Sequence, residues 1–133
     1  RYCADGCARQ ARLSSMRQPK GKALFSLLHD ACRDNEYEDP DHGKRGADLA
    51  AHLHGKLFDA TSEELALLTD ACERHSLGLT KADVTIQTCW DADRLDLGRV
   101  GIKPHPKYLC TAAAKGSEVI QAAFLRSKAA DYA

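Results

Sequence analysis

An all-α fold is predicted for this chain of 133 residues by two features of its sequence. Ala, Leu, Lys, Arg and Glu dominate the composition, and these residues favour helices. β-Branched residues are scarce, and apolar residues recur at intervals of three and four rather than two, which is the spacing of one helix face. The length and an apolar content of 44% suffice for a single core. We therefore predict one domain that spans residues 1–133.

Six helices are expected, separated by segments that break regular structure. RQPKG separates the first two helices, DPDHG opens the third, and TSEE forms a capping box for the fourth. HSLGLTKAD closes the fourth helix and begins the fifth. The glycines and prolines of GRVGIKPHPKYLCT then predict an ordered loop. The expected helices are Tyr2–Ser15, Lys22–Cys32, Asp41–Leu57, Ser62–His75, Asp83–Leu97 and Ser117–Lys128.

Charge and hydropathy give no signal for nucleic acid or membranes. The 19 basic residues balance 19 acidic ones, so the chain lacks the net positive charge that binding to either usually needs. No apolar run approaches the roughly 20 residues that cross a bilayer, and no signal peptide opens the chain. We expect a cytoplasmic protein.

Six cysteines raise the question of disulfides or zinc. Most of them stand singly among helix-periodic apolar residues, where a thiol behaves as a small hydrophobic group. Cys3 and Cys7 lie one helical turn apart, but no second pair stands at zinc-finger spacing. The sequence therefore predicts reduced, buried thiols.

A carboxylate stands on the apolar face of the fifth helix. Five residues share one stripe of that helix: Ile86, Cys89, Trp90, Asp93 and Leu97. Asp91 lies about 200° from Asp93 around the helix. An isolated buried charge costs several kcal/mol unless it is paired or binds a metal. We expect Asp93 to be functional, Asp91 to be structural and Trp90 to belong to the core.

The second expected helix ends in a histidine beside an aspartate. Phe25, Leu28, His29 and Cys32 form one stripe, and Asp30 lies about 100° around the helix. An imidazole and two carboxylates that converge from two helices would make a mixed nitrogen and oxygen site. Such a site suits a divalent transition metal.

These segments resemble the HD-domain superfamily of metal-dependent phosphohydrolases. The resemblance lies in LFSLLHDACRDNE, DPDHGKRGADLA and CWDADRLDLGRVGI, and it covers roughly residues 25–102. It implies an HD-domain helical bundle in which His29, Asp30 and Asp93 bind a divalent ion, either Mn, Ni, Mg, Fe or Zn. It also implies hydrolysis of a nucleotide or another small phosphate ester, with Asp30 as a catalytic residue. Arg33 follows the doublet by three residues, so its planar guanidinium could meet a substrate phosphate as a catalytic residue or instead form a salt bridge with Asp34 or Glu36.

The superfamily pattern has further histidines. By resemblance, His42 and His75 line the pocket or hold a second metal. The pattern also places a ligating histidine upstream of the doublet, and this chain has no histidine before His29. We therefore expect the domain to lack an N-terminal helix, and the implied metal site to be short of one ligand.

Two other functions stay open at this point. One is a degenerate HD module that binds a nucleotide or a protein without turnover, and the other is an HD-type oxygenase with two irons. His52, His54 and His105 are not expected to be ligands. A group of basic residues are alternatives to Arg33 at a substrate phosphate, although charge on a helix is usually only solvated: Lys44, Arg45, Arg94 and Arg99.

Overall fold

The computed structural model describes residues 19–35 and 37–130, and these form an all-α structure. The expected helix Tyr2–Ser15 and the pair Cys3 and Cys7 lie outside the described residues. The described part contains five α-helices and two short 3₁₀ helices: α2 Pro19–Leu28, α3 His42–Leu53, α4 Ser62–Arg74, α5 Val84–Leu95, η1 Leu97–Val100, η2 Pro106–Tyr108 and α6 Ser117–Ala130. None of the described helices combines the length and the hydropathy needed to cross a membrane.

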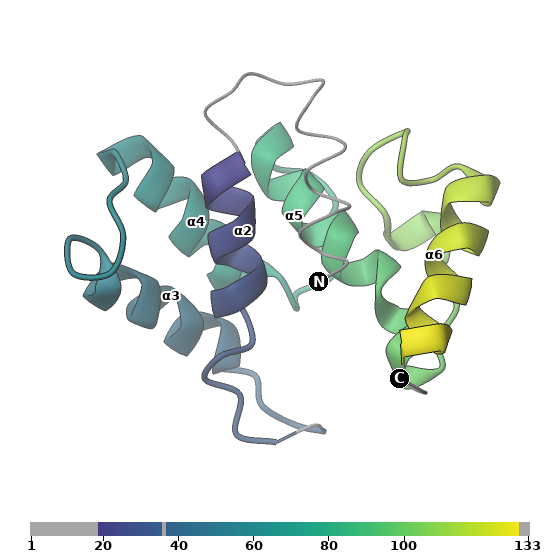
Figure 1. Ribbon diagram of the computed structural model, residues 1–133, viewed down its shortest axis with the longest axis horizontal. Coiled ribbons are helices and arrows are strands. Elements are labelled where there is room, and N and C mark those ends of the chain that lie inside the picture. Colours follow the sequence, from purple (N-terminus) through teal and green to yellow (C-terminus); the bar gives the residue numbers. More distant parts are fainter. Residues whose placement is uncertain (1–18, 36, 131–133) are drawn as a thin grey trace.

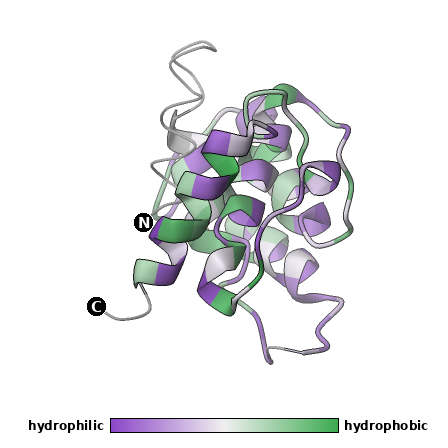
Figure 2. Cartoon of the chain, turned by 90° about the vertical axis from the view of Figure 1, so that its right-hand side faces the viewer, coloured by the Kyte–Doolittle hydropathy of each residue, from purple (hydrophilic) through white to green (hydrophobic). Residues whose placement is uncertain are grey.

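Helices α2 to α5 enclose the main core. Helices α3 and α4 pack side by side, and α2 packs against α4 and α5 (Figure 1). The helices carry both hydrophobic and hydrophilic residues (Figure 2), so each can turn an apolar face inward. Trp90 is fully buried, as predicted, and its Nε1 donates to the carbonyl oxygen of Ala71 at 3.0 Å. The core consists of Phe25, Leu28, Ala47, Ala50, Leu68, Ala71, Cys72, Ile86, Cys89 and Trp90.

Helix α6 packs beside this bundle, against η1 (Figure 1). A second apolar cluster of Leu109, Ala114 and Ile120 packs with Leu95 and joins α6 to the end of α5. A Cβ on Gly98 would lie 2.8 Å from Ser127 Cβ and 2.9 Å from Phe124 O. Only glycine therefore lets η1 approach α6 so closely.

The predicted end of α2 was wrong by four residues. The predicted start was wrong as well, because the helix begins at Pro19 rather than at Lys22 and takes in residues 19–21 of the segment RQPKG, which was expected to lie outside it. Proline suits a first helical turn. The helix ends at Leu28 rather than at Cys32. The His29 amide still donates to Phe25 O at 3.0 Å, but the next bonds are tight turns from Ala31 to Leu28 and from Arg33 to Asp30. The His29-Asp30 doublet therefore lies in a turn, not within the helix.

Other boundaries follow local chemistry. Helix α3 ends at Leu53 instead of Leu57, because Gly55 takes a left-handed φ of 78° and its amide donates to Phe58 O at 2.8 Å. Helix α4 begins at the predicted capping box, where the Thr61 and Glu64 side chains each bond the other residue's backbone amide. Helix α5 ends at Leu95 instead of Leu97, and Leu97 opens η1.

The cysteines of the described region are free thiols. Cys72 and Cys89 are buried, and Cys32 and Cys110 are partly buried. Burial raises the pKa of the Cys72 thiol to about 12, so this thiol stays protonated and unreactive. This agrees with the prediction of reduced cysteines.

Candidate metal centre

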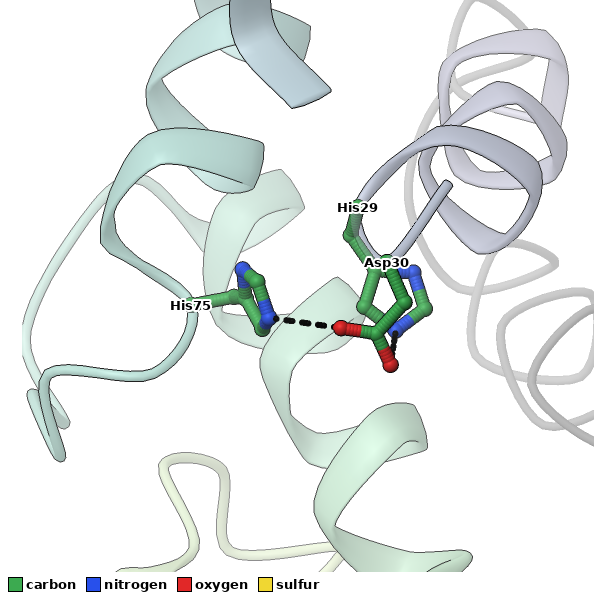
Figure 3. Close-up of side chains that lie close together, drawn as sticks. All are labelled: His29, Asp30 and His75. Carbon is green, nitrogen blue, oxygen red and sulfur yellow. Dashed lines mark ion pairs between the residues drawn. The ribbon is translucent and has the colours of Figure 1, made fainter. Parts of the chain in front are cut away.

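Polar side chains from the ends of four helices meet at one place in the bundle. His29 and Asp30 follow α2, His42 is the first residue of α3, His75 follows α4, and Asp93 lies in the last turn of α5. One ligand atom each of His29, Asp30 and His75 lies within 4.8 Å of the others (Figure 3). We call these five residues the His/Asp cluster. The structure thus brings together the residues that the sequence pattern singles out.

Each histidine of the cluster is oriented by a backbone carbonyl group. The Nδ1 atoms of His29, His42 and His75 face the carbonyl oxygens of Phe25, Asp39 and Cys72, respectively. Because a carbonyl oxygen can only accept a hydrogen bond, we assign the proton of each neutral ring to Nδ1. The Nε2 atoms then carry lone pairs, the form in which an imidazole with a carbonyl partner binds a metal.

These Nε2 atoms face other electron-rich atoms. His29 Nε2 lies 3.2 Å from Asp93 Oδ1 and 3.4 Å from Asp30 Oδ2. The Nε2 atoms of His42 and His75 each lie 3.3 Å from Asp30 Oδ1 and 3.0 Å from each other. Lone pairs this close repel one another unless a proton or a metal ion lies between them. Positive charge within the cluster, from a proton on His29 or from a metal ion, would relieve this repulsion.

Within the His/Asp cluster, Asp30 Oδ1 is a buried atom that lacks a hydrogen-bond partner among the described residues. It accepts no hydrogen bond of good geometry from them, although two imidazoles lie 3.3 Å away. A buried polar atom in this state costs about 1–3 kcal/mol. A divalent cation would satisfy this oxygen, and nitrogen ligands beside carboxylates favour a transition metal. The residues present thus fit the metal that the sequence predicts.

The charges of the cluster shift the pKa values of three groups. Burial lowers the pKa of His29, but the hydrogen bond and charge of Asp93 and the charge of Asp30 outweigh burial and raise this pKa above its ordinary value. Contact with His75 lowers the pKa of Asp30. Burial raises the pKa of Asp93, but its hydrogen bond with His29 and the charges of His29 and His75 together outweigh burial and lower this pKa. Both carboxylates are therefore ionised at neutral pH.

Two glycines of α3 bring the helix ends together. A Cβ on Gly43 would lie 2.6 and 2.7 Å from two carbonyl oxygens at the end of α4, and a Cβ on Gly46 would lie 2.7 Å from Leu28 O at the end of α2. Side chains larger than hydrogen would hold α3 away from both neighbours. The resemblance implies a pocket or second-metal role for His42 and His75. The signal in the sequence that could have placed these two histidines together is the pair Gly43 and Gly46, which allows the close packing of α3.

Arg33 lies beside the cluster, as its predicted role at a phosphate requires. Its Nη1 lies 3.3 Å from His42 Nε2 and 3.6 Å from Asp30 Oδ1. Its Nε donates to Asn35 O at 2.8 Å, which holds the guanidinium in place. Arg33 is thus close enough to meet a group bound at Asp30.

Among the alternative basic residues, only Arg99 contacts the cluster. Its Nη2 lies 3.8 Å from Asp93 Oδ1. The other three have partners elsewhere: Lys44 with Asp48, Arg45 with Asp39, and Arg94 with Tyr108 O. Arg99 belongs to η1, the 3₁₀ helix after α5, which α-helical periodicity does not describe.

Asp91 has the structural position that the helical spacing predicts. Its buried carboxylate accepts from Cys110 N at 2.6 Å, from Thr111 N at 2.9 Å and from Thr111 Oγ1 at 2.7 Å. These bonds tie the loop before α6 to α5. The other histidines contact atoms outside the cluster. His52 contacts the Lys56 side chain, His54 contacts the carbonyl oxygen of Ala60, and His105 accepts from the amide of Lys107.

A cavity of about 720 Å³ opens elsewhere, between α2, α4 and α5. Its walls include Gly21, Phe25, Thr61 and Ile86, and no residue of the His/Asp cluster lines it. Phe25 separates the two places, since its ring stacks on His29 with ring centroids 4.6 Å apart. The candidate site is therefore the cluster, not the cavity.

No protein-family model, curated protein or solved structure matches this chain. The resemblance to the HD-domain superfamily therefore rests on the residues of the chain and on their arrangement.

Proposed function

We propose that this chain is an HD-type domain that uses a divalent transition metal to hydrolyse a nucleotide or another small phosphate ester. One observation carries the proposal: three oriented imidazoles direct Nε2 lone pairs at the carboxylates of Asp30 and Asp93. The helical fold of the described residues and the turn that presents the His29-Asp30 doublet also support an HD-domain bundle.

Each residue of the cluster has a distinct task in this proposal. His29, Asp30 and His75 hold the ion, Asp93 completes the site beside His29, and His42 supports it from α3. When bound, a divalent ion polarises a phosphoryl oxygen and lowers the pKa of a bound water toward about 7. The side chain of Asp30 is 35% exposed, whereas the His29 side chain is 7% exposed, so Asp30 can also orient the attacking water.

Arg33 acts on the substrate. Its guanidinium side chain is 29% exposed and borders Asp30, where it would donate to phosphate oxygens as negative charge develops on them. Its bond to Asn35 O fixes this orientation before a substrate arrives. Preorganised donors of this kind stabilise a transition state without further rearrangement.

A di-iron oxygenase is the second candidate, because the two faces of Asp30 are compatible with the two ions that it needs. Oδ1 faces His42 and His75, while Oδ2 faces His29. A carboxylate that faces two sets of nitrogen ligands suits two ions, and both phosphoryl transfer and oxygen chemistry use paired metals. Oxygen consumption by Fe²⁺-loaded protein, without phosphate release by the Mn²⁺ form, would favour the oxygenase.

The test is phosphate release by the purified chain loaded with Mn²⁺ or Ni²⁺. A panel of nucleoside monophosphates, nucleoside triphosphates and p-nitrophenyl phosphate should contain substrates. Asp30→Asn and His75→Ala should abolish turnover, while Lys56→Gln, beyond the far end of α3 from His42, should not. Calorimetrically bound metal with no release from any substrate would refute hydrolysis and favour the degenerate binding module.

A further inference from the structure

A second arginine borders the His/Asp cluster, at a different carboxylate from Arg33. Arg99 Nη2 lies 3.8 Å from Asp93 Oδ1, and Arg33 Nη1 lies 3.6 Å from Asp30 Oδ1. His29 Nε2 lies between the two carboxylates, 3.2 Å from Asp93 and 3.4 Å from Asp30. The two guanidinium groups therefore contact the two carboxylates that both lie beside the same imidazole nitrogen, that of His29.

Both arginines are held in the same way. Arg99 Nε lies 3.1 Å from Asp96 Oδ2, and Arg33 Nε donates to Asn35 O at 2.8 Å. In each case a fixed Nε leaves the terminal nitrogens directed at the cluster. A guanidinium held in advance loses less conformational freedom when it binds an anion.

Helix α6 supports the position of Arg99. Asp96 uses its other oxygen, Oδ1, to accept from Ser127 Oγ of α6 at 2.9 Å. Gly98 brings η1 so close to α6 that a Cβ would lie 2.8 Å from Ser127 Cβ. Hydrogen bonds from Ser127 to Asp96 and from Arg99 to Asp96 thus hold Arg99 in position. Ser127 belongs to α6, which lies outside the segments that resemble the HD superfamily.

Stability alone does not account for this arrangement. The Arg99 side chain is 41% exposed and lies 3.8 Å from Asp93, and exposed pairs at such distances contribute little. The His42 and His75 side chains, at 4% exposure each, form the buried floor, and the two arginines stand at the solvent side. Arg99 could give up its weak contact with Asp93 at little cost and donate to an anion bound beside His29 Nε2, next to Asp93.

We infer that Arg99 is a second phosphate-binding residue, and that Arg33 and Arg99 together select a phosphate monoester dianion. The inference rests on the proposed function and names its substrate class. A monoester has three non-bridging oxygens, which match one position on the metal and one on each guanidinium. A diester has only two such oxygens and one negative charge, so it cannot use all three partners. Charge-assisted, forked bonds to phosphate are the contacts for which arginine is suited.

Inorganic phosphate is the direct probe of this site. Calorimetry should show that Arg99→Ala weakens phosphate binding to the Mn²⁺-loaded chain about tenfold, as expected for one lost charge-assisted bond. Arg99→Lys, which keeps the charge without the fork, should fall between Arg99→Ala and the unchanged chain. Lys56→Gln removes an equal charge far from the cluster and should bind phosphate normally. Equal phosphate affinity in Arg99→Ala and the unchanged chain would overturn the inference.

Turnover separates this inference from the proposed function. Arg99→Ala should raise KM for p-nitrophenyl phosphate about tenfold and leave KM for bis(p-nitrophenyl) phosphate within about twofold. Ser127→Ala should act in the same direction but more weakly, because it removes only the support of Asp96. If the unchanged chain hydrolyses monoesters and Arg99→Ala does so with the same KM, the inference fails while the proposed function stands. If the unchanged chain hydrolyses nothing, the proposed function fails, and phosphate binding still decides the role of Arg99.

Discussion

Gly43→Ala should damage the proposed metal centre without replacing any of the residues proposed to hold the ion. The new Cβ would lie 2.6 Å from Cys72 O and 2.7 Å from Glu73 O, both of them backbone atoms that cannot rotate away. An ordinary contact begins at 3.4 Å, so α3 must move by about 0.8 Å from the end of α4. His42, the next residue along the chain, moves with it.

The expected loss of stability follows from two opposing effects. Overpacking of this kind costs about 1–3 kcal/mol. Replacement of glycine by alanine within a helix returns about 1 kcal/mol through helix propensity. We therefore expect a net loss of about 1 kcal/mol in the free energy of unfolding, and an affinity for Mn²⁺ about tenfold lower because His42 and His75 no longer meet at 3.0 Å.

Urea denaturation and calorimetric Mn²⁺ titration of the same samples measure both effects. Gly21→Ala is the matched control, because it lies in α2 and its Cβ would meet no described residue within 4 Å. This control should gain about 0.5–1 kcal/mol and bind Mn²⁺ normally. If Gly43→Ala gains stability like the control and keeps its Mn²⁺ affinity, the close approach of α3 and α4 is not what forms the site.

Two further predictions concern a structural carboxylate and pH. Asp91→Asn should lower the free energy of unfolding, measured by urea denaturation, by about 1–3 kcal/mol, because its new NH₂ group would oppose the amides of Cys110 and Thr111. Its Mn²⁺ affinity should change less than about twofold. A large loss of metal binding would show that Asp91 acts in the site. In the metal-free chain, the raised pKa of His29 adds stability that is complete below about pH 6.5 and is lost as pH rises through the folded value. The lowered pKa values of Asp30 and Asp93 add stability that is present above about pH 3.9 and is lost as pH falls through their folded values. Thermal melts should therefore show maximal stability of the metal-free chain between these two pH limits. The Mn²⁺ affinity should rise with pH as His29 releases its proton. A metal affinity that does not change between pH 6 and 9 would contradict the role of His29.

Most of the fold follows from local patterns. Apolar spacing located each of the five described α-helices, and the Thr61 capping box fixed the start of α4. The start of α2 was placed three residues late, at Lys22 instead of Pro19. The larger errors lie at C-terminal ends, where the chain leaves a helix for reasons that periodicity does not contain. After α3, the Gly55 amide donates a hydrogen bond to the carbonyl oxygen of Phe58, and α2 ends where the His29-Asp30 doublet forms a turn.

The candidate site was predictable only in part. Asp93 could be found because a charge on an apolar stripe demands an explanation, and His29 and Asp30 stood beside a similar stripe. The contacts of His42 and His75 with Asp30 depend on how closely α3 packs, and the position of Arg99 depends on α6. Such tertiary contacts leave no periodic signal in the sequence.

The measurement that bears most directly on the metal centre is an anomalous difference map from crystals of this chain soaked in Mn²⁺. We predict a peak that lies about 2.0–2.3 Å from His29 Nε2, His75 Nε2 and an Asp30 carboxylate oxygen. Asp30→Asn crystals soaked in the same way should lose this peak. A map with no anomalous density among these residues, or with manganese bound only elsewhere on the chain, would contradict the assignment of the cluster as a metal centre.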